Sequence, residues 1–178
     1  MKVFEPTWLV SAIYNISPSD LKHQGIRVIL TDLDNTLVAW NNPDGTKELH
    51  DWLAKMQAVG IIVMVVSNNK SARIARALKQ LDLPFVSRAL KPLPVGINHA
   101  IKELGVPKSA VVMVGDQLMT DVWAGNVAGV RTILVKPLIQ TDAWNTQFNR
   151  LIERFVFKQL EKKQPLIYRE DLNGNNHQ

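Results

Sequence analysis

Acidic side chains recur in this sequence directly after runs of apolar residues, where buried strands would end. Asp32 and Asp34 stand two residues apart at the end of one run, and Asp116 and Asp121 follow a later one. Residues two apart in extended chain point to the same side, so we expect Asp32 and Asp34 to project into one crevice. Carboxylates gathered so closely repel one another and oppose folding unless a cation joins them. Their oxygen atoms suit Mg²⁺, which binds one or two carboxylates together with substrate phosphate.

Groups that bind phosphate follow the other apolar runs. Ser67 and Asn68 end the second run, and Lys91 lies in the loop Ala89-Leu90-Lys91-Pro92. A hydroxyl donor and a positive charge hold phosphoryl oxygen atoms. We therefore predict phosphate binding by Ser67 and Lys91. No G-x-x-x-x-G-K-[ST] sequence occurs, which excludes a P-loop nucleotide hydrolase.

The elements that must position these residues alternate between strands and helices. Continuous apolar runs predict strands at Arg27–Leu33, Ile61–Ser67, Ala110–Gly115 and Arg131–Val135, with a very short one at Phe85–Val86. The segments between them predict helices at Thr46–Val59, Ser71–Leu81, Pro94–Leu104 and Thr120–Ala128. Strands that are apolar on both faces belong to a parallel sheet covered by helices. We therefore expect a doubly wound α/β fold, whose ligands bind at the carboxyl ends of the strands.

We expect the chain to consist of a core with a segment before it and two segments after it. Residues 1–25 form a helical segment packed on the core, and residues 26–140 form the catalytic core. Residues 141–172 add an amphipathic helix and tail to the same domain, and residues 173–178 form a disordered tail.

Composition limits the classes of protein that fit. The 178 residues include no cysteine, which excludes disulfides, thiolate zinc sites and iron–sulfur clusters. The longest aliphatic run, Ile61–Val66, is far too short to span a membrane, and the start does not resemble a secretory signal. We expect a cytoplasmic protein. Its formal charge of +5 permits an anionic partner without demanding nucleic acid.

The order and type of these residues resemble the haloacid dehalogenase (HAD) superfamily of aspartate-nucleophile phosphatases. The four motifs of that superfamily match Asp32, Asp34 and Thr36; Ser67; Lys91; and Gly115-Asp116 with Asp121. The layout is most similar to the YqeG-like, subclass IIIA branch, which resembles phosphatidylglycerophosphate phosphatases. The residues that support this branch are Phe4-x-Pro6, Thr31–Leu37 and Ser67-Asn68-Asn69.

The resemblance implies a role for each matching residue. Asp32 would attack phosphorus and form an aspartyl-phosphate, and Asp34 would act first as general acid and then as general base. Mg²⁺ would be held by the Asp32 carboxylate, the main-chain carbonyl of Asp34, and Asp116. Thr36 would fix the loop, and Asp121 would hold a metal-bound water or orient Lys91. Asn68 would bind the phosphate of the substrate together with Ser67 and Lys91, or else serve the turn. The implied fold is a Rossmannoid three-layer sandwich with a mainly parallel sheet.

The spacing of the motifs leaves no room for a large cap domain. Only residues 37–66 and 68–90 separate the first three motifs, so we expect an open site screened by the loop Val38–Thr46. Such a site suits a macromolecule or a phospholipid head group, or else a second copy of the chain covers it. Trp40 in this loop is interpreted equally as a packing anchor and as a substrate contact.

The C-terminal residues leave two interpretations open. Trp144–Gln164 is predicted to form an amphipathic helix, capped at Thr141-Asp142, with Phe157 inside its basic face. We favour a helix whose apolar face covers the sheet, and peripheral contact with an anionic membrane is the alternative. The alternative for the whole chain is a basic RNA- or ribosome-binding module on a HAD fold without catalysis. A phospho-accepting receiver domain fits less well, because its aspartate follows a later strand.

Overall fold

The computed structural model describes residues 2–39, 42, 45–139, 156–158, 161 and 167–172. Its centre is a six-stranded sheet in the order β1-β6-β5-β2-β3-β4, in which every pair of neighbouring strands is parallel. The strands are β1 (Trp8–Val10), β2 (Val28–Thr31), β3 (Ile62–Val66), β4 (Phe85–Val86), β5 (Val111–Gly115) and β6 (Arg131–Val135). The α/β class with a parallel sheet is therefore confirmed.

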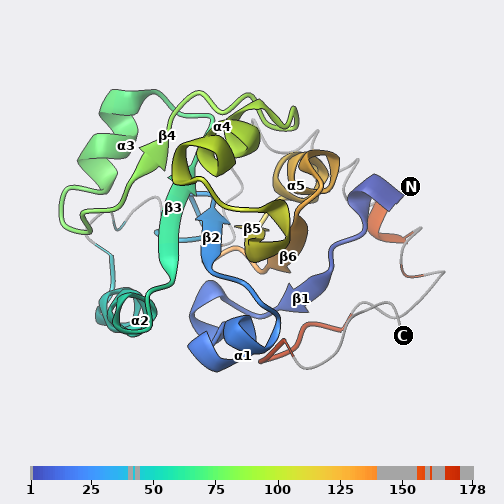
Figure 1. Ribbon diagram of the computed structural model, residues 1–178, viewed down its shortest axis with the longest axis horizontal. Helices are drawn as coiled ribbons and strands as arrows, with labels where there is room; N and C mark the ends of the chain where they lie inside the picture. The colour runs from blue at the N-terminus through green and yellow to red at the C-terminus, as the bar shows by residue number, and fades with distance from the viewer. Residues whose placement is uncertain are drawn as a thin grey trace.

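Helices cover both faces of the sheet. The α-helices are α1 (Pro18–His23), α2 (Lys47–Ala58), α3 (Ser71–Ala77), α4 (Val95–Leu104) and α5 (Trp123–Ala128). Shorter turns are η1 (Lys2–Phe4), η2 (Ile13–Asn15), η3 (Lys108–Ala110) and the π-helical η4 (Leu118–Val122). Figure 1 shows α1 and α2 on one side of the sheet and α4 and α5 on the other.

Two apolar cores result from the alternation of side chains along each strand. Ile29 and Val63 point into the core beneath α1 and α2, whereas Leu30 and Met64 point into the core beneath α4 and α5. The side chains at the centres of both cores are fully buried. This arrangement explains why the apolar runs are continuous, since each strand is buried on both faces.

The first segment differs from the predicted helix. Its residues 8–10 form strand β1 at the sheet edge, parallel to β6, with Leu9 opposite Leu134. Trp8 and Val10 face one core, while Leu9 faces a smaller cluster on the other side of the sheet. Three successive apolar residues that are buried on both faces fit a strand, whereas a helix of this size would bury one side only. Within residues 2–25 the only α-helix is α1, which begins at Pro18 after the capping hydroxyl of Ser17.

The predicted boundaries of two helices also shift. Helix α3 ends at Ala77, four residues earlier than expected, and α5 begins after the π-helical turn η4. Helix α2 follows the prediction closely, because the side chain of Thr46 caps it by accepting the amide N–H of Leu49. The domain boundaries at residues 26, 141 and 173 remain predictions.

The C-terminal segment packs against the outer edge of β1. The amide of Arg169 donates to the carbonyl of Leu9 at 2.8 Å, and Leu172 is buried in the core near α1. Residues 156–158 and 161 are helical, while most of the predicted helix Trp144–Gln164, its cap and the tail 173–178 lie outside the described residues. Phe157 packs against an apolar cluster instead of standing in a free basic face.

Candidate active site

The site lies where the course of the chain reverses across the sheet. From β2 the chain proceeds to β3 and β4 on one side, and it then returns to β5 on the other side of β2. The carboxyl ends of β2 and β5 are therefore adjacent and open a crevice, which is where ligands bind in folds of this kind. Asp32 follows β2 and Asp116 follows β5, so both project into this crevice.

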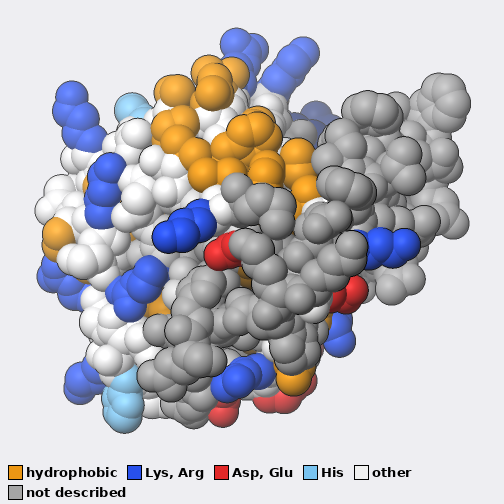
Figure 2. All heavy atoms as spheres, turned by 90° about the vertical axis from the view of Figure 1, so that its right-hand side faces the viewer, with side chains coloured by type: hydrophobic (Ala, Val, Ile, Leu, Met, Phe, Trp, Pro, Cys, Tyr) orange, Lys and Arg blue, Asp and Glu red, His pale blue; other side chains and the backbone are white. Residues whose placement is uncertain are grey.

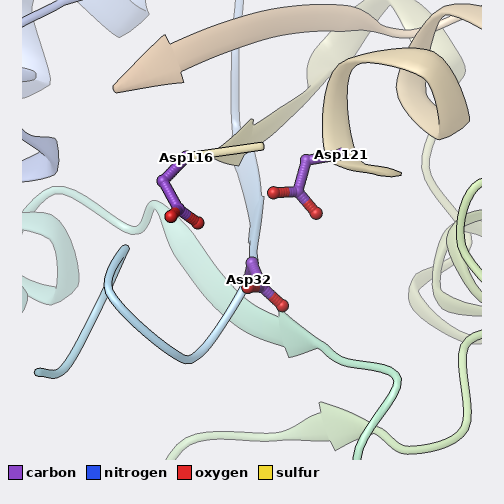
Figure 3. A group of neighbouring side chains, drawn as sticks. All are labelled: Asp32, Asp116 and Asp121. Atoms are coloured by element: carbon purple, nitrogen blue, oxygen red, sulfur yellow. The ribbon is translucent and has the colours of Figure 1, made fainter. Parts of the chain in front are cut away.

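Three carboxylates meet in the crevice. Asp32, Asp116 and Asp121 each place an oxygen atom within 4.8 Å of the other two, and Figure 3 shows their side chains turned toward one another. Turn η4 brings Asp121 back to the end of β5, where its Oδ2 accepts the amide of Gln117 at 3.1 Å. A Cβ atom at Gly115 would overlap the Asp121 carboxylate, so this close approach requires glycine at position 115.

Lys91 is enclosed by two of these carboxylates. Its Nζ lies 2.8 Å from Asp32 Oδ1 and 2.7 Å from Asp121 Oδ1, and its side chain is only 2% exposed. Burial disfavours the charged form of Lys91, but the attraction of Asp121 and then Asp32 outweighs burial and raises its pKa. Lys91 is thus a fixed ammonium group at the site, held between Asp121 and Asp32.

The carboxylates outnumber the cations in this crevice. Burial raises the pKa of Asp116 to about 8, with further contributions from Asp121 and Asp32. Burial also raises the pKa of Asp32 to about 6. The attraction of Lys91 lowers this pKa and the repulsion of Asp121 raises it, so Lys91 offsets the effect of burial only in part. Three carboxylates face one ammonium group, an excess of two negative charges that a divalent cation would balance. Among the described residues, Asp116 makes no salt bridge, so the donor set fits a hard cation there.

Thr36 links the loop after β2 to the end of β5. Its hydroxyl donates to Asp116 Oδ1 at 3.0 Å, and its side chain is fully buried. The loop turns tightly at Asn35, which adopts a left-handed φ of 60° that asparagine tolerates better than most residues. This geometry agrees with the supporting role expected for Thr36.

The end of β3 holds a buried hydroxyl. Ser67 is 1% exposed, and its Oγ accepts both the amide N–H of Asn69 at 3.2 Å and the Nδ2 of Asn69 at 3.0 Å. With its acceptor positions used by nitrogen donors, the hydroxyl hydrogen of Ser67 is left to donate.

Asn68 contacts the main chain of Lys91, and its predicted contact with phosphate stays a prediction. Its Oδ1 accepts the amide of Lys91 at 2.8 Å, and its Nδ2 donates to the carbonyl of Lys91 at 2.9 Å. Both ends of the side-chain amide are thus engaged with the main chain of the lysine. Asn68 positions the Lys91 loop, because a paired amide of this kind fixes the loop against the end of β3.

Asp34 is held by Arg73 and Asn69, whose contacts with it no sequence pattern predicts. Arg73 donates Nη1 to Asp34 Oδ2 at 2.6 Å and Nη2 to Oδ1 at 3.0 Å, and Asn69 Nδ2 donates to Oδ2 at 2.9 Å. Arg73 lies in the first turn of α3, just after the carboxyl end of β3. The sequence signal for Arg73 is a basic residue in the first turn of a helix that follows a strand of the site. The partner of Arg73 does not follow from this signal, because it depends on the orientation of α3.

Nothing large covers the crevice in the described part of the chain. Between β2 and β3 the described residues contain one helix, α2, and between β3 and β5 they contain α3, β4, α4 and η3. Trp40 lies outside the described residues. No described helix is both long and apolar enough to cross a membrane.

The basic side chains visible on one face of the molecule are spread out. Figure 2 shows Lys and Arg side chains standing singly over the described part of this face, with hydrophobic side chains gathered near its top. Nucleic-acid binding depends on a basic patch or stripe that follows phosphates. This face therefore gives no support to the RNA- or ribosome-binding alternative.

Comparison with known proteins identifies the family. Residues 5–129 match the family model of haloacid dehalogenase-like hydrolases. The sequence is 40% identical to the "Probable phosphatase YqeG" of Bacillus subtilis over 95% of this chain and 98% of that protein. It is also 29% identical to "Phosphatidylglycerophosphate phosphatase 1, chloroplastic" of Chlamydomonas reinhardtii, over 76% of this chain and 54% of that protein. The chain therefore belongs to the haloacid dehalogenase-like hydrolases.

Solved structures agree with this fold. A haloacid dehalogenase-like hydrolase from Bacteroides fragilis matches with a TM-score of 0.52 and 17% identity, over 69% of this chain and 93% of that one. An uncharacterized protein from Listeria monocytogenes matches with a TM-score of 0.54 and 18% identity, over 66% and 84%. Family and relatives together identify the chain as a HAD-type phosphatase, a phosphoric monoester hydrolase.

Proposed function

We propose that this phosphatase is Mg²⁺-dependent and hydrolyses a phosphomonoester through an aspartyl-phosphate on Asp32. The observation that carries the proposal is the position of Asp32 at the switch point of the sheet, 2.8 Å from the Lys91 ammonium and beside Asp116. A nucleophilic carboxylate needs positive charge close by, where the phosphoryl oxygens develop charge.

Each residue of the crevice has a separate role in the proposed reaction. An oxygen of Asp32 attacks phosphorus, the bond to the leaving oxygen breaks, and Asp34 gives that oxygen a proton. Water then attacks the phosphorus of the aspartyl-phosphate while Asp34 takes a proton from it, and phosphate leaves with Asp32 restored. The ammonium of Lys91 and the hydroxyl of Ser67 bind the phosphoryl oxygens.

The metal would be held by the carboxylates of Asp32 and Asp116 and by the main-chain carbonyl of Asp34. When bound, it would supply Lewis-acid stabilisation of the charge on the phosphoryl oxygens. The excess of negative charge around Asp116 supports this assignment, because it is the carboxylate of the cluster without a cationic partner among the described residues.

Metal removal is expected to change both activity and stability. EDTA should reduce hydrolysis of 4-nitrophenyl phosphate to background, and excess Mg²⁺ should restore it. The raised pKa values of Asp32, about 6, and Asp116, about 8, mean that the folded protein binds protons more tightly than the unfolded chain. The stability of the metal-free protein should therefore fall as the pH rises from about 4 to about 8. Mg²⁺ at 100 times its Kd should add about 2.7 kcal/mol, and the melting midpoint at pH 8.5 should rise by roughly 5–10 °C.

Two variants serve as controls in the same melting experiment. Asp116→Asn keeps an oxygen that accepts from Thr36 but removes the charge, so it should stabilise the metal-free protein at pH 8.5 and abolish the Mg²⁺ effect. Asp51→Asn, an exposed carboxylate on α2, should leave the Mg²⁺ effect unchanged. An equal Mg²⁺ shift in wild type and Asp116→Asn would contradict the metal assignment.

For the substrate, we propose a phospholipid head group such as that of phosphatidylglycerophosphate. Two relatives carry that activity in their names, those from Chlamydomonas reinhardtii and Arabidopsis thaliana. The described part of the chain places no cap over the crevice, and three apolar side chains stand exposed in the segment that carries Lys91. Leu90, Leu93 and Val95 are each more than half exposed, and they flank Lys91 in sequence. Exposed apolar side chains in the segment that carries a residue of an open site suit contact with an anionic membrane.

Leu93→Ser tests this membrane contact. Withdrawing a leucine from the lipid should cost about 1.5–3 kcal/mol, so hydrolysis of phosphatidylglycerophosphate in anionic vesicles should fall by about tenfold or more, together with vesicle flotation. Val59→Ser provides the matched control, because Val59 is equally exposed but lies just before β3, at the amino ends of the strands, whereas the site lies at their carboxyl ends. Equal losses in both variants would contradict the membrane surface.

A further inference from the structure

The two oxygens of Asp34 are both occupied in the structure. Oδ1 accepts a hydrogen bond from Arg73 Nη2, whereas Oδ2 accepts from Arg73 Nη1 and from Asn69 Nδ2. The proposed mechanism needs one oxygen of Asp34 to contact the leaving oxygen of the substrate. An oxygen of Asp34 that carries the proton for the leaving group is a poorer acceptor, so its hydrogen bond to Arg73 or Asn69 is weakened at that step.

Arg73 is the partner suited to leave. Its side chain is half exposed, and it projects from the first turn of α3 toward the crevice. Asn69 is held more firmly, because it also donates its amide N–H and its Nδ2 to the buried Ser67. When Arg73 turns away, Oδ1 of Asp34 becomes free while Oδ2 stays anchored by Asn69.

Another anion compensates a guanidinium for the loss of a carboxylate more fully than water does. The planar fork of arginine binds carboxylates and phosphates through two parallel hydrogen bonds. Since the leaving oxygen must lie against Asp34, the rest of the leaving group must lie close to Arg73. A negative charge on that leaving group is therefore within the region that the guanidinium can reach.

We propose that Arg73 forms an anion subsite that selects phosphomonoesters whose leaving alcohol carries a second negative charge, a carboxylate or a phosphodiester. Binding of the second anion draws Arg73 from Asp34 and frees Oδ1 for the leaving oxygen. A neutral leaving group does not compete for the guanidinium, so Asp34 stays engaged. This inference rests on the proposed function, because it requires the leaving group beside Asp34.

Two pairs of soluble substrates test the subsite. The carboxylate pair is 2-phosphoglycolate and its neutral amide, and the diester pair is glycerophosphoglycerol phosphate and its neutral methyl triester. Wild type should prefer the anionic member of at least one pair by about tenfold or more in kcat/KM, and the pair that shows the preference identifies the type of anion. Arg73→Gln should reduce that preference to about twofold or less, and Arg73→Lys should retain part of it, since lysine keeps the charge without the fork.

The control is Arg76→Gln on the same helix, whose preference should equal that of wild type. Thermal melts of all variants establish that they are folded. Absence of any preference in wild type, or an unchanged preference in Arg73→Gln, overturns the subsite. A failure of the proposed function looks different: wild type would hydrolyse neither member of either pair, or Asp32→Asn would hydrolyse them as fast as wild type.

Discussion

Asp32→Asn is expected to reduce phosphomonoesterase activity by roughly 10⁴-fold or more, the size of loss seen when a nucleophile is removed. Asparagine has nearly the same shape, and its Oδ1 still accepts a hydrogen bond from Lys91, so the fold should survive. What disappears is the carboxylate oxygen that attacks phosphorus. Steady-state hydrolysis of 4-nitrophenyl phosphate with Mg²⁺ measures the loss.

Acid quenching identifies the chemical step that fails. With a ³²P-labelled substrate, wild type should carry acid-precipitable label for as long as turnover continues, and Asp32→Asn should carry none. Asp51→Asn is the matched control, because it removes an exposed carboxylate on α2 and should behave as wild type does. Activity of Asp32→Asn within tenfold of wild type would refute the assignment of the nucleophile.

Lys91→Met is expected to destroy activity and also to weaken the fold. Methionine fills a similar volume without the charge, so Asp121 and Asp32 would lose the ammonium that both contact. Removing one member of a buried ion pair costs about 3–5 kcal/mol, because the remaining charge has no partner. Urea unfolding should show that decrease in the free energy of unfolding, and hydrolysis should fall by roughly 10³-fold or more.

A double variant separates the two effects of Lys91. Lys91→Met combined with Asp121→Asn removes one of the two unpaired carboxylate charges, so it should recover part of the lost stability while activity stays absent. Lys47→Met removes the exposed partner of Asp51 and should leave the unfolding midpoint unchanged. A wild-type midpoint for Lys91→Met would show that the lysine is not the buried counter-ion.

Much of the fold follows from local patterns in the sequence. Continuous apolar runs such as Ile62–Val66 predict buried parallel strands, because only such strands hide both faces. The meeting of Asp32 with Asp116 follows too, since the carboxyl ends of parallel strands lie at one edge of the sheet. The sequence does not predict strand β1, because three residues are too few to show the side-chain pattern of a strand.

The tertiary structure decided which groups these side chains contact. The pairing of Asp34 with Arg73 depends on the orientation of α3, and the pairing of Asn68 with the main chain of Lys91 depends on how two loops meet. Sequence patterns report which face of an element is buried, which is a local property. Hydrogen-bond partners are chosen by distances between elements far apart in the chain, and only the packed fold sets those distances.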